Sequence, residues 1–287
     1  FMNQKNKVNK IGIRYHIIVG LILTMLACHL PLWSVSIPLE IRHAVYPAAS
    51  EEQKCILIDK QGLIWIGSDN GIKSYDGYLF KSFHNHSKSP RVLPSNNIRC
   101  MTEDHDDGIW IGTEGGLARM DKTTNRFTIY QLPIKTAGKS VFPLFTASNG
   151  DVWMGYDNLL VRYVRKSKKF QIFHQGNTQV IETNGNKNRL HFSDVQSFAE
   201  DRHGNIYLGT WQHGIYRVNW QKRTLYQLQL PDGKNIAAHA LLFDRKGRLW
   251  IGTWGKGVCC LTTPWNPKNS GYIDYSKGGK DFTINYR

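Results

Sequence analysis

The stretch "IWIGTEGGL" at residues 109–117 has close copies along the chain, and these copies decide the fold. Each copy has an aromatic anchor, a glycine two positions later and, in four of the five copies, a second glycine after a short polar turn. The anchors lie 45, 43, 54 and 43 residues apart, and they are Trp65, Trp110, Trp153, Tyr207 and Trp250. The glycines that follow them are Gly67, Gly112, Gly155, Gly209 and Gly252. A period of this length is typical of repeat architectures.

Each repeat divides into four segments with the length and alternation of β-strands. The first segment, such as "CILID" at 55–59, precedes a turn in which Gly62 or Asp107 can take a positive φ. The second contains the anchor, the third follows the glycine-ended turn, and the fourth closes the unit, as "RFTIY" does at 126–130. Four short antiparallel strands form the blade of a β-propeller. The sequence therefore predicts an all-β propeller over 37–287, with blades at roughly 51–85, 95–132, 140–175, 192–230 and 236–276.

The anchors are expected to be structural. An aromatic ring between neighbouring blades buries a large apolar area, and the glycine that follows leaves room for the close approach of a neighbour. Direct stacking on a ligand is the alternative. Cys55 and Cys100 occupy matching positions of two repeats, where the others have a small residue, so we expect both thiols to be packed.

Residues 1–36 are predicted to be a signal peptide or a membrane anchor. The positive stretch "MNQKNKVNKIGIRYH" precedes the apolar "IIVGLILTMLAC", which is the order of an n-region and an h-region. The small residues "SVS" at 34–36 offer a cleavage position, whereas the apolar run that continues through "PLW" fits an uncleaved anchor. In both cases the remaining chain is expected to be exported to the periplasm.

The net charge of +15 raises the question of a nucleic-acid partner. Four of the positive residues belong to the N-terminal segment, and the only later cluster, at 162–169, lies between two strand-like stretches. We therefore interpret that cluster as a solvated turn and expect no nucleic-acid partner. The cysteines do not show the spacing of metal ligands, so neither a metal nor a cofactor is predicted.

The pattern D-x-x-G-x-[IL]-W-[IM]-G-T-x-x-G-[IL] resembles the two-component regulator propeller repeat. Residues 93–130 are similar to one full unit, including the "SNN" lead-in to the first strand, and the resemblance extends over about 51–287. Departures are Tyr207 in place of tryptophan, Tyr156 in place of threonine, Leu159 in place of the turn glycine, and the insertion at 174–193.

This resemblance implies the N-terminal periplasmic sensor part of a hybrid two-component histidine kinase of the Bacteroides type. Such proteins typically carry seven-bladed propellers, so the five repeats are expected to be part of a larger ring. The resemblance also implies a parent protein that is anchored in the inner membrane, dimerises, and responds to oligosaccharides through a kinase further along the chain. These residues themselves are expected to catalyse no reaction.

A candidate ligand site lies in the turns between the second and third strands. The turns of the fourth and fifth repeats carry Trp211 and Trp254 at matching places, with His213 and Lys256 nearby. Indole faces stack on sugar C–H surfaces while polar groups bind hydroxyls, so these residues predict a sugar platform. The alternative is that both tryptophans cover a blade interface. The corresponding turns of the other repeats add the candidates Asp69, Glu114, Tyr156 and Asp157.

Two other function classes remain open. One is a non-catalytic scaffold that binds another protein or dimerises. The other is an enzyme similar to streptogramin lyases, which also carry a repeated tryptophan motif. In this chain glycine follows each anchor, and no His–carboxylate set recurs where a channel site would form. The sequence therefore favours the oligosaccharide sensor over the scaffold, and both over the enzyme.

Overall fold

A computed structural model describes residues 51–86, 92–132, 135, 138–174, 177–181, 192–228, 230, 236–255, 257–264 and 272–274. The predicted leader at 1–36 lies outside the described residues. Within these ranges, no helix has the length and apolar character needed to cross a membrane.

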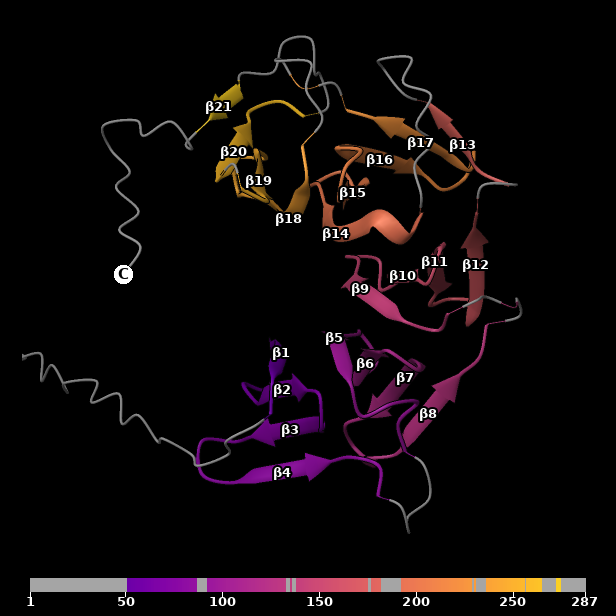
Figure 1. The fold of residues 1–287 in the computed structure, drawn as a ribbon, viewed down its shortest axis with the longest axis vertical. Helices are drawn as coiled ribbons and strands as arrows, with labels where there is room; N and C mark the ends of the chain where they lie inside the picture. The colour runs from indigo at the N-terminus through magenta and orange to yellow at the C-terminus, as the bar shows by residue number, and fades with distance from the viewer. Residues whose placement is uncertain are drawn as a thin grey trace, which may run out of the picture. The chain divides into compact units, whose positions relative to one another are not determined.

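The described strands form five sheets in chain order, and each sheet contains an antiparallel meander of four consecutive strands (Figure 1). The first blade contains β1 (Gln53–Ile58), β2 (Ile64–Ser68), β3 (Gly71–Tyr75) and β4 (Phe80–Phe83). The second contains β5 (Ile98–Glu103), β6 (Gly108–Thr113), β7 (Gly116–Asp121) and β8 (Phe127–Tyr130). The third contains β9 (Val141–Thr146), β10 (Val152–Tyr156), β11 (Leu159–Val164) and β12 (Lys169–Phe173).

The fourth blade contains β14 (Val195–Glu200), β15 (Ile206–Thr210), β16 (Ile215–Asn219) and β17 (Thr224–Gln227), preceded by the 3-10 turn η1 (Phe192–Asp194). The fifth contains β18 (Ala238–Phe243), β19 (Leu249–Thr253), β20 (Val258–Leu261) and β21 (Tyr272–Asp274). The prediction of an all-β propeller built from four-stranded blades is confirmed.

One strand was not predicted. The insertion between the third and fourth repeats contains β13 (Gln179–Ile181), which pairs in parallel with β17. The fourth sheet therefore has five strands. A blade normally ends in an edge strand with unpaired backbone groups, and the insertion supplies a segment that satisfies them at β17.

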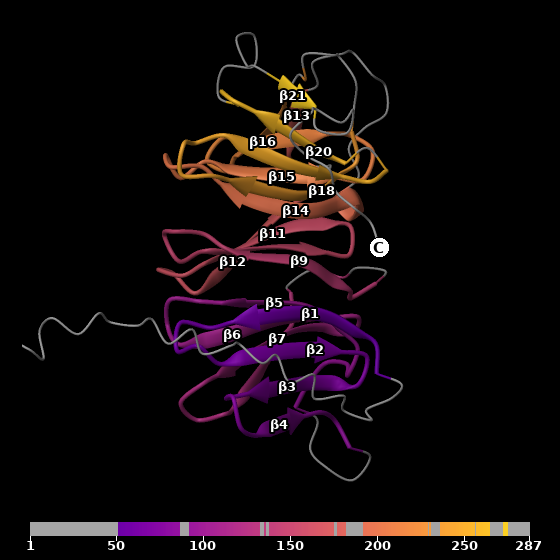
Figure 2. The same cartoon turned by 90° about the vertical axis from the view of Figure 1, so that its left-hand side faces the viewer.

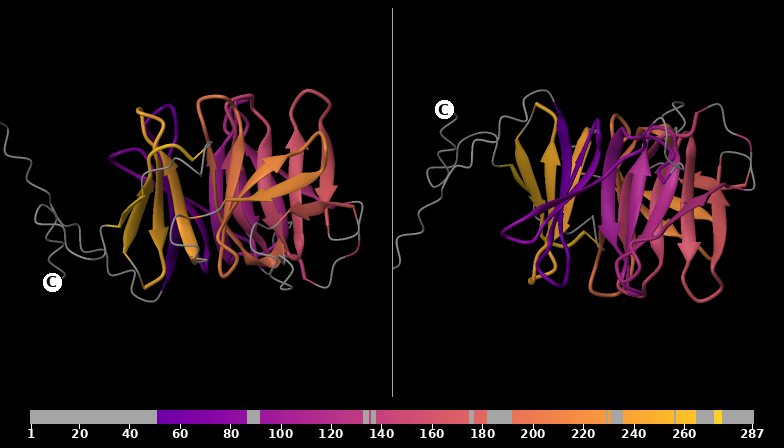
Figure 3. Two further views of the ribbon diagram at one scale, coloured as in Figure 1. Left: turned by 90° about the horizontal axis from the view of Figure 1, so that it is seen from above. Right: turned by 90° about the horizontal axis from the view of Figure 1, so that it is seen from below.

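Consecutive blades lie side by side, and their first strands contact one another: β1 meets β5, β5 meets β9, β9 meets β14, and β14 meets β18. Figure 2 and Figure 3 show the successive sheets facing each other. Each of these four interfaces holds one apolar cluster that draws side chains from both blades. The clusters contain the anchors Trp65, Trp110, Trp153 and Tyr207, all buried. The prediction that the anchors pack between blades is confirmed for these four.

Most of the anchors donate a hydrogen bond to a buried aspartate. The indole N–H of Trp110 donates to Asp104 at 2.9 Å, and that of Trp65 donates to Asp59 at 3.0 Å. The same carboxylates accept backbone N–H groups of the turn before the anchor, such as that of Gly108 at 2.9 Å. One side chain thus fixes both the hairpin turn and the ring. The signal was present in the sequence as an aspartate six residues before the anchor.

The glycine after each anchor faces the first strand of its own blade. Gly67 pairs with Cys55 and Gly112 pairs with Cys100. A Cβ atom on Gly112 would lie 2.5 Å from the Cys100 sulfur and 2.6 Å from the carbonyl oxygen of Val141 in the next blade. This contact explains why small residues occupy the cysteine position, and it leaves both thiols packed, as expected.

Candidate ligand-binding sites

The turn between the second and third strands has the same anchoring in every blade. A backbone N–H in each turn donates to a carbonyl in the lead-in to the first strand, at 2.8–3.2 Å. The donors are Asp69, Glu114, Asp157, Trp211 and Trp254, and their acceptors are Glu52, Asn97, Ser140, Asp194 and Ala237. The five turn candidates therefore occupy equivalent positions, which are acidic in the first three blades and tryptophan in the last two.

The structure brings the two predicted tryptophans together. The ring centroids of Trp211 and Trp254 lie 5.7 Å apart, although they come from different blades. Trp211 is 37% exposed and Trp254 is 68% exposed. A third ring joins them, since the ring centroid of His239 lies 4.7 Å from that of Trp211 and 5.3 Å from that of Trp254. We call these three residues the tryptophan platform.

His239 was not among the sequence candidates. It lies at a bulge in β18, between Ala238, which pairs with Thr253, and Ala240, which pairs with Gly252. A bulge turns a side chain out of the normal alternation, and the same bulge recurs at the corresponding point of β1, β5 and β14. The Nε2 atom of His239 is buried and has no hydrogen-bond partner among the described residues. An unsatisfied buried polar atom costs about 1–3 kcal/mol.

The sequence placed two polar residues beside the tryptophans, His213 and Lys256, and His213 is not part of this cluster of rings. His213 turns toward Asp194, with 3.4 Å between its Nε2 and the carboxylate, and its side chain is 12% exposed. Its backbone N–H donates to Thr210, and its carbonyl accepts from Gln227. His213 therefore holds the base of the turn. Lys256 lies outside the described residues.

The acidic turn residues belong to the first three blades and make local contacts. The carboxylate of Glu114 lies 3.4 Å from Arg99, and that of Asp157 accepts the backbone N–H of Gly138 at 3.0 Å. Asp69 is exposed in the first blade. These residues thus occupy the turn position that corresponds to Trp211 and Trp254, but they belong to blades that do not carry the platform.

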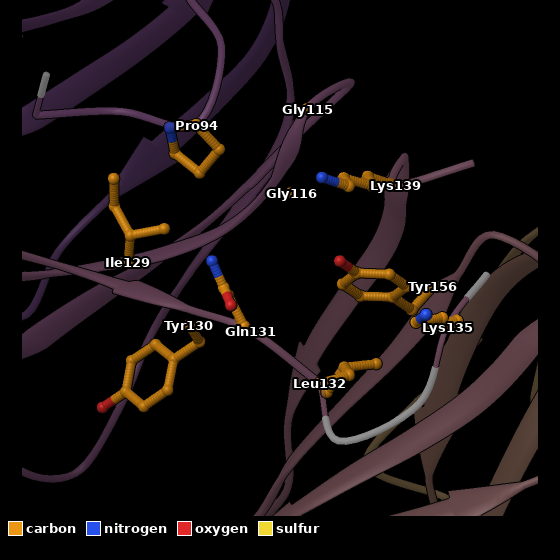
Figure 4. A pocket seen from close by; sticks show the side chains of 10 residues that line it. All are labelled: Pro94, Gly115, Gly116, Ile129, Tyr130, Gln131, Leu132, Lys135, Lys139 and Tyr156. Atoms are coloured by element: carbon orange, nitrogen blue, oxygen red, sulfur yellow. The ribbon is translucent and has the colours of Figure 1, made fainter. Parts of the chain in front are cut away.

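Tyr156 lies in a separate pocket between the second and third blades (Figure 4). The pocket has a volume of about 480 Å³. Its lining residues are Pro94, Gly115, Gly116, Ile129, Tyr130, Gln131, Leu132, Lys135, Lys139 and Tyr156. We call it the lysine pocket. The seven sequence candidates that the structure describes are therefore distributed over the platform, the lysine pocket and individual turns.

Within the described ranges, no group of three or more His, Cys, Asp or Glu residues is placed to hold a metal ion. The described cysteines Cys55, Cys100, Cys259 and Cys260 are free thiols. Burial raises the pKa of Cys55 to about 11, so this thiol stays protonated at neutral pH and is a poor nucleophile.

Two stretches of the chain match the family model of the two-component regulator propeller, at residues 92–115 and 230–255. The first stretch ends in the turn after β6 and the second in the turn after β19. Over 92 residues the chain is also 32% identical to histidine kinase P4 of Formosa agariphila, in a match that covers 31% of this chain and 6% of that kinase. The chain thus corresponds to a small part of that relative.

Solved structures share the fold. The extracellular domain of a hybrid two-component system from B. thetaiotaomicron is 23% identical with a TM-score of 0.58, and the match covers 80% of this chain and 28% of that one. A virginiamycin B lyase from Staphylococcus aureus is 15% identical with a TM-score of 0.59, over 79% of this chain and 71% of that one. At these identities the likeness concerns the fold alone. The chain thus contains two stretches that match the two-component regulator propeller model, within a β-propeller of four-stranded blades.

Proposed function

We propose that this chain is the exported input part of a hybrid two-component sensor and that it binds an oligosaccharide at the tryptophan platform. The repeat family and the kinase relative support a signalling context. The platform carries the binding proposal, because two exposed indole rings flank a buried imidazole nitrogen that has no partner among the described residues. In this proposal the parent protein is a dimeric histidine kinase of the inner membrane.

The platform suits a sugar by its chemistry. Indole faces contact the apolar C–H surface of a pyranose ring, and a polar group beside them orients the ring through a hydroxyl. In this arrangement Trp211 and Trp254 stack on the ligand, and the ring of His239 lies beside both indoles. The backbone bonds from the two tryptophans to Asp194 and Ala237 hold the platform against the lead-ins of two blades.

A ligand on this platform would bridge the fourth and fifth blades. Because each tryptophan belongs to a different blade, a sugar that contacts both rings favours one spacing of the two blades over others. A ligand shifts a conformational equilibrium only through such differential contacts. We propose this spacing as the first step of the signal.

Calorimetric titration of the chain with a panel of neutral plant and host oligosaccharides tests the proposal. Trp211→Ala and Trp254→Ala are each expected to weaken binding about tenfold or more, which corresponds to about 1.4 kcal/mol. Trp220→Ala is the matched control, because Trp220 is 38% exposed and lies beneath Arg162, away from the platform. Sugar binding that both platform variants retain, or an absence of binding across the panel, would contradict the proposal.

A second candidate function is a protein-interaction scaffold. Ile56 and Ile58 of β1 are 67% and 66% exposed, and Leu242 of β18 is 65% exposed. Their neighbours Leu57 and Leu241 pack into the inter-blade clusters, so the exposed residues lie on the opposite faces of these strands. Apolar sheet faces of this kind suit a partner. Sedimentation analysis of the wild type and Ile58→Glu tests this function, which predicts a dimer that the variant dissociates.

A further inference from the structure

The lysine pocket differs in chemistry from the tryptophan platform. Its volume of about 480 Å³ falls within the range of roughly 300–1,000 Å³ that is usual for small-molecule sites. The second blade contributes the turn between β6 and β7 and the end of β8, while the third blade contributes Tyr156 at the end of β10. Lys135 and Lys139 line it from the segment that leads into β9.

The polar groups of the pocket converge. In Figure 4 the ammonium of Lys139, the hydroxyl of Tyr156 and the carboxamide of Gln131 point toward the same space. Neither Lys135 nor Lys139 makes an ion pair with any described residue, and the lining contains no carboxylate. The lining therefore carries positive charge with no carboxylate among its own residues.

Two turn carboxylates adjoin the pocket, and each has a partner of its own. Glu114 lies against Arg99, and Asp157 accepts the N–H of Gly138. Burial, and then the neighbouring charge of Asp157, raises the pKa of Tyr156. Its hydroxyl therefore remains a hydrogen-bond donor at neutral pH.

Glycine keeps the floor of the pocket open. Gly116 has a φ of +140°, and a Cβ atom there would lie 3.3 Å from Pro94 and 4.0 Å from the hydroxyl of Tyr156. A Cβ atom on Gly115 would lie 2.8 Å from the carbonyl oxygen of Pro94. A side chain at either glycine would thus crowd the space beneath the converging polar groups.

We propose that the lysine pocket binds an acidic sugar, with the carboxylate of a uronate residue held by Lys139. The hydroxyl of Tyr156 and the carboxamide of Gln131 bond the hydroxyls of the ring, while Ile129 contacts its apolar face. Charge-assisted hydrogen bonds are the stronger ones in such a site. A bare inorganic anion would engage only the ammonium groups and leave the apolar wall unused, so the lining favours a ring that carries its charge. This site does not depend on the platform, which lies on other blades.

Titration calorimetry at low ionic strength tests the site with digalacturonate, neutral galactobiose and inorganic sulfate. We expect digalacturonate to bind at least tenfold more tightly than galactobiose and to weaken as salt is added. Lys139→Gln should weaken digalacturonate binding about tenfold and Tyr156→Phe severalfold, while Lys139→Arg retains most of it. Lys246→Gln, at an exposed lysine of the fifth blade, and Trp254→Ala should leave it unchanged.

Three results would overturn the proposal. Equal affinity for the acidic and neutral disaccharides would show that the lysines do not select charge. Sulfate binding as tight as that of digalacturonate, with the same response to Lys139→Gln, would indicate an adventitious ion only. Loss of digalacturonate binding in Trp254→Ala, with binding intact in Lys139→Gln, would place the acidic sugar on the platform. Unchanged melting temperatures of the variants exclude misfolding as the cause of a loss.

Discussion

Replacing Asp104 with asparagine is predicted to be among the most destabilising single changes in the second blade. The carboxylate accepts the indole N–H of Trp110 at 2.9 Å, the guanidinium Nε of Arg119 at 2.6 Å, and the backbone N–H groups of Asp106 and Gly108 at 2.7 and 2.9 Å. Asp104 is 4% exposed. Asparagine at this place would turn an N–H₂ group toward donors and remove the charge that balances Arg119.

The expected loss in the free energy of unfolding follows from leaving Arg119 without its carboxylate partner. Removing one member of a buried ion pair costs about 3–5 kcal/mol. Because the Arg119 side chain is 19% exposed and regains part of its hydration, we expect the lower end, about 3 kcal/mol. For a chain of this size that loss corresponds to a melting temperature lower by roughly 6–12 °C. Thermal and urea unfolding followed by circular dichroism measure it.

Asp244→Asn is the matched comparison. Asp244 likewise accepts from the anchor Trp250 at 2.9 Å and from an arginine, Arg248 of the preceding turn, at 2.6 Å, but in the fifth blade, where the anchor is only half-buried. Its substitution should therefore cost clearly less than that of Asp104. If Asp104→Asn costs under about 1 kcal/mol, or no more than Asp244→Asn, the buried aspartate does not hold the blade as argued.

Three further outcomes follow from the packing and the pKa shifts. Burial raises the pKa of Asp104, but its hydrogen bonds outweigh burial, so the net pKa is lowered. The folded form therefore binds protons less readily than the unfolded form, and the free energy of unfolding should fall as the pH drops below about 4. Urea titrations should show a steeper fall in the wild type than in Asp104→Asn. Gly112→Ala should cost about 1–3 kcal/mol by denaturant unfolding, because its Cβ would lie 2.5 Å from the Cys100 sulfur, whereas Gly252→Ala, with its nearest contact at 3.2 Å, should cost less. Cys55, with a pKa of about 11, should react with iodoacetamide at pH 8 roughly a hundredfold or more slowly in the native state than in urea, followed by mass spectrometry.

The repeat made the fold predictable because one pattern encodes one blade. The anchors repeat every blade, so their spacing predicted both the number of sheets and the burial of Trp110 between two of them. The same equivalence predicted that Trp211 and Trp254 occupy matching turns, and the structure shows that neighbouring blades place the two rings in contact.

Features that depend on contacts between blades could not be predicted in this way. His239 joins the platform because a bulge in β18 turns it toward a ring of the preceding blade. Tyr156 lines a pocket together with Pro94 and Ile129 of the second blade. In both cases the sequence of one repeat does not contain these partners. The strand β13 escaped prediction because its short segment pairs with β17, which is distant in the chain.

Indole NMR during addition of an oligosaccharide tests the central claim most directly. The chain has nine tryptophans, so its ¹⁵N-labelled form gives a small set of indole N–H signals that Trp→Phe variants assign. The account predicts saturable shifts of the Trp211 and Trp254 signals, with those of Trp110 and Trp220 unchanged. Binding of a sugar that moves other indole signals and leaves Trp211 and Trp254 unaffected would contradict it.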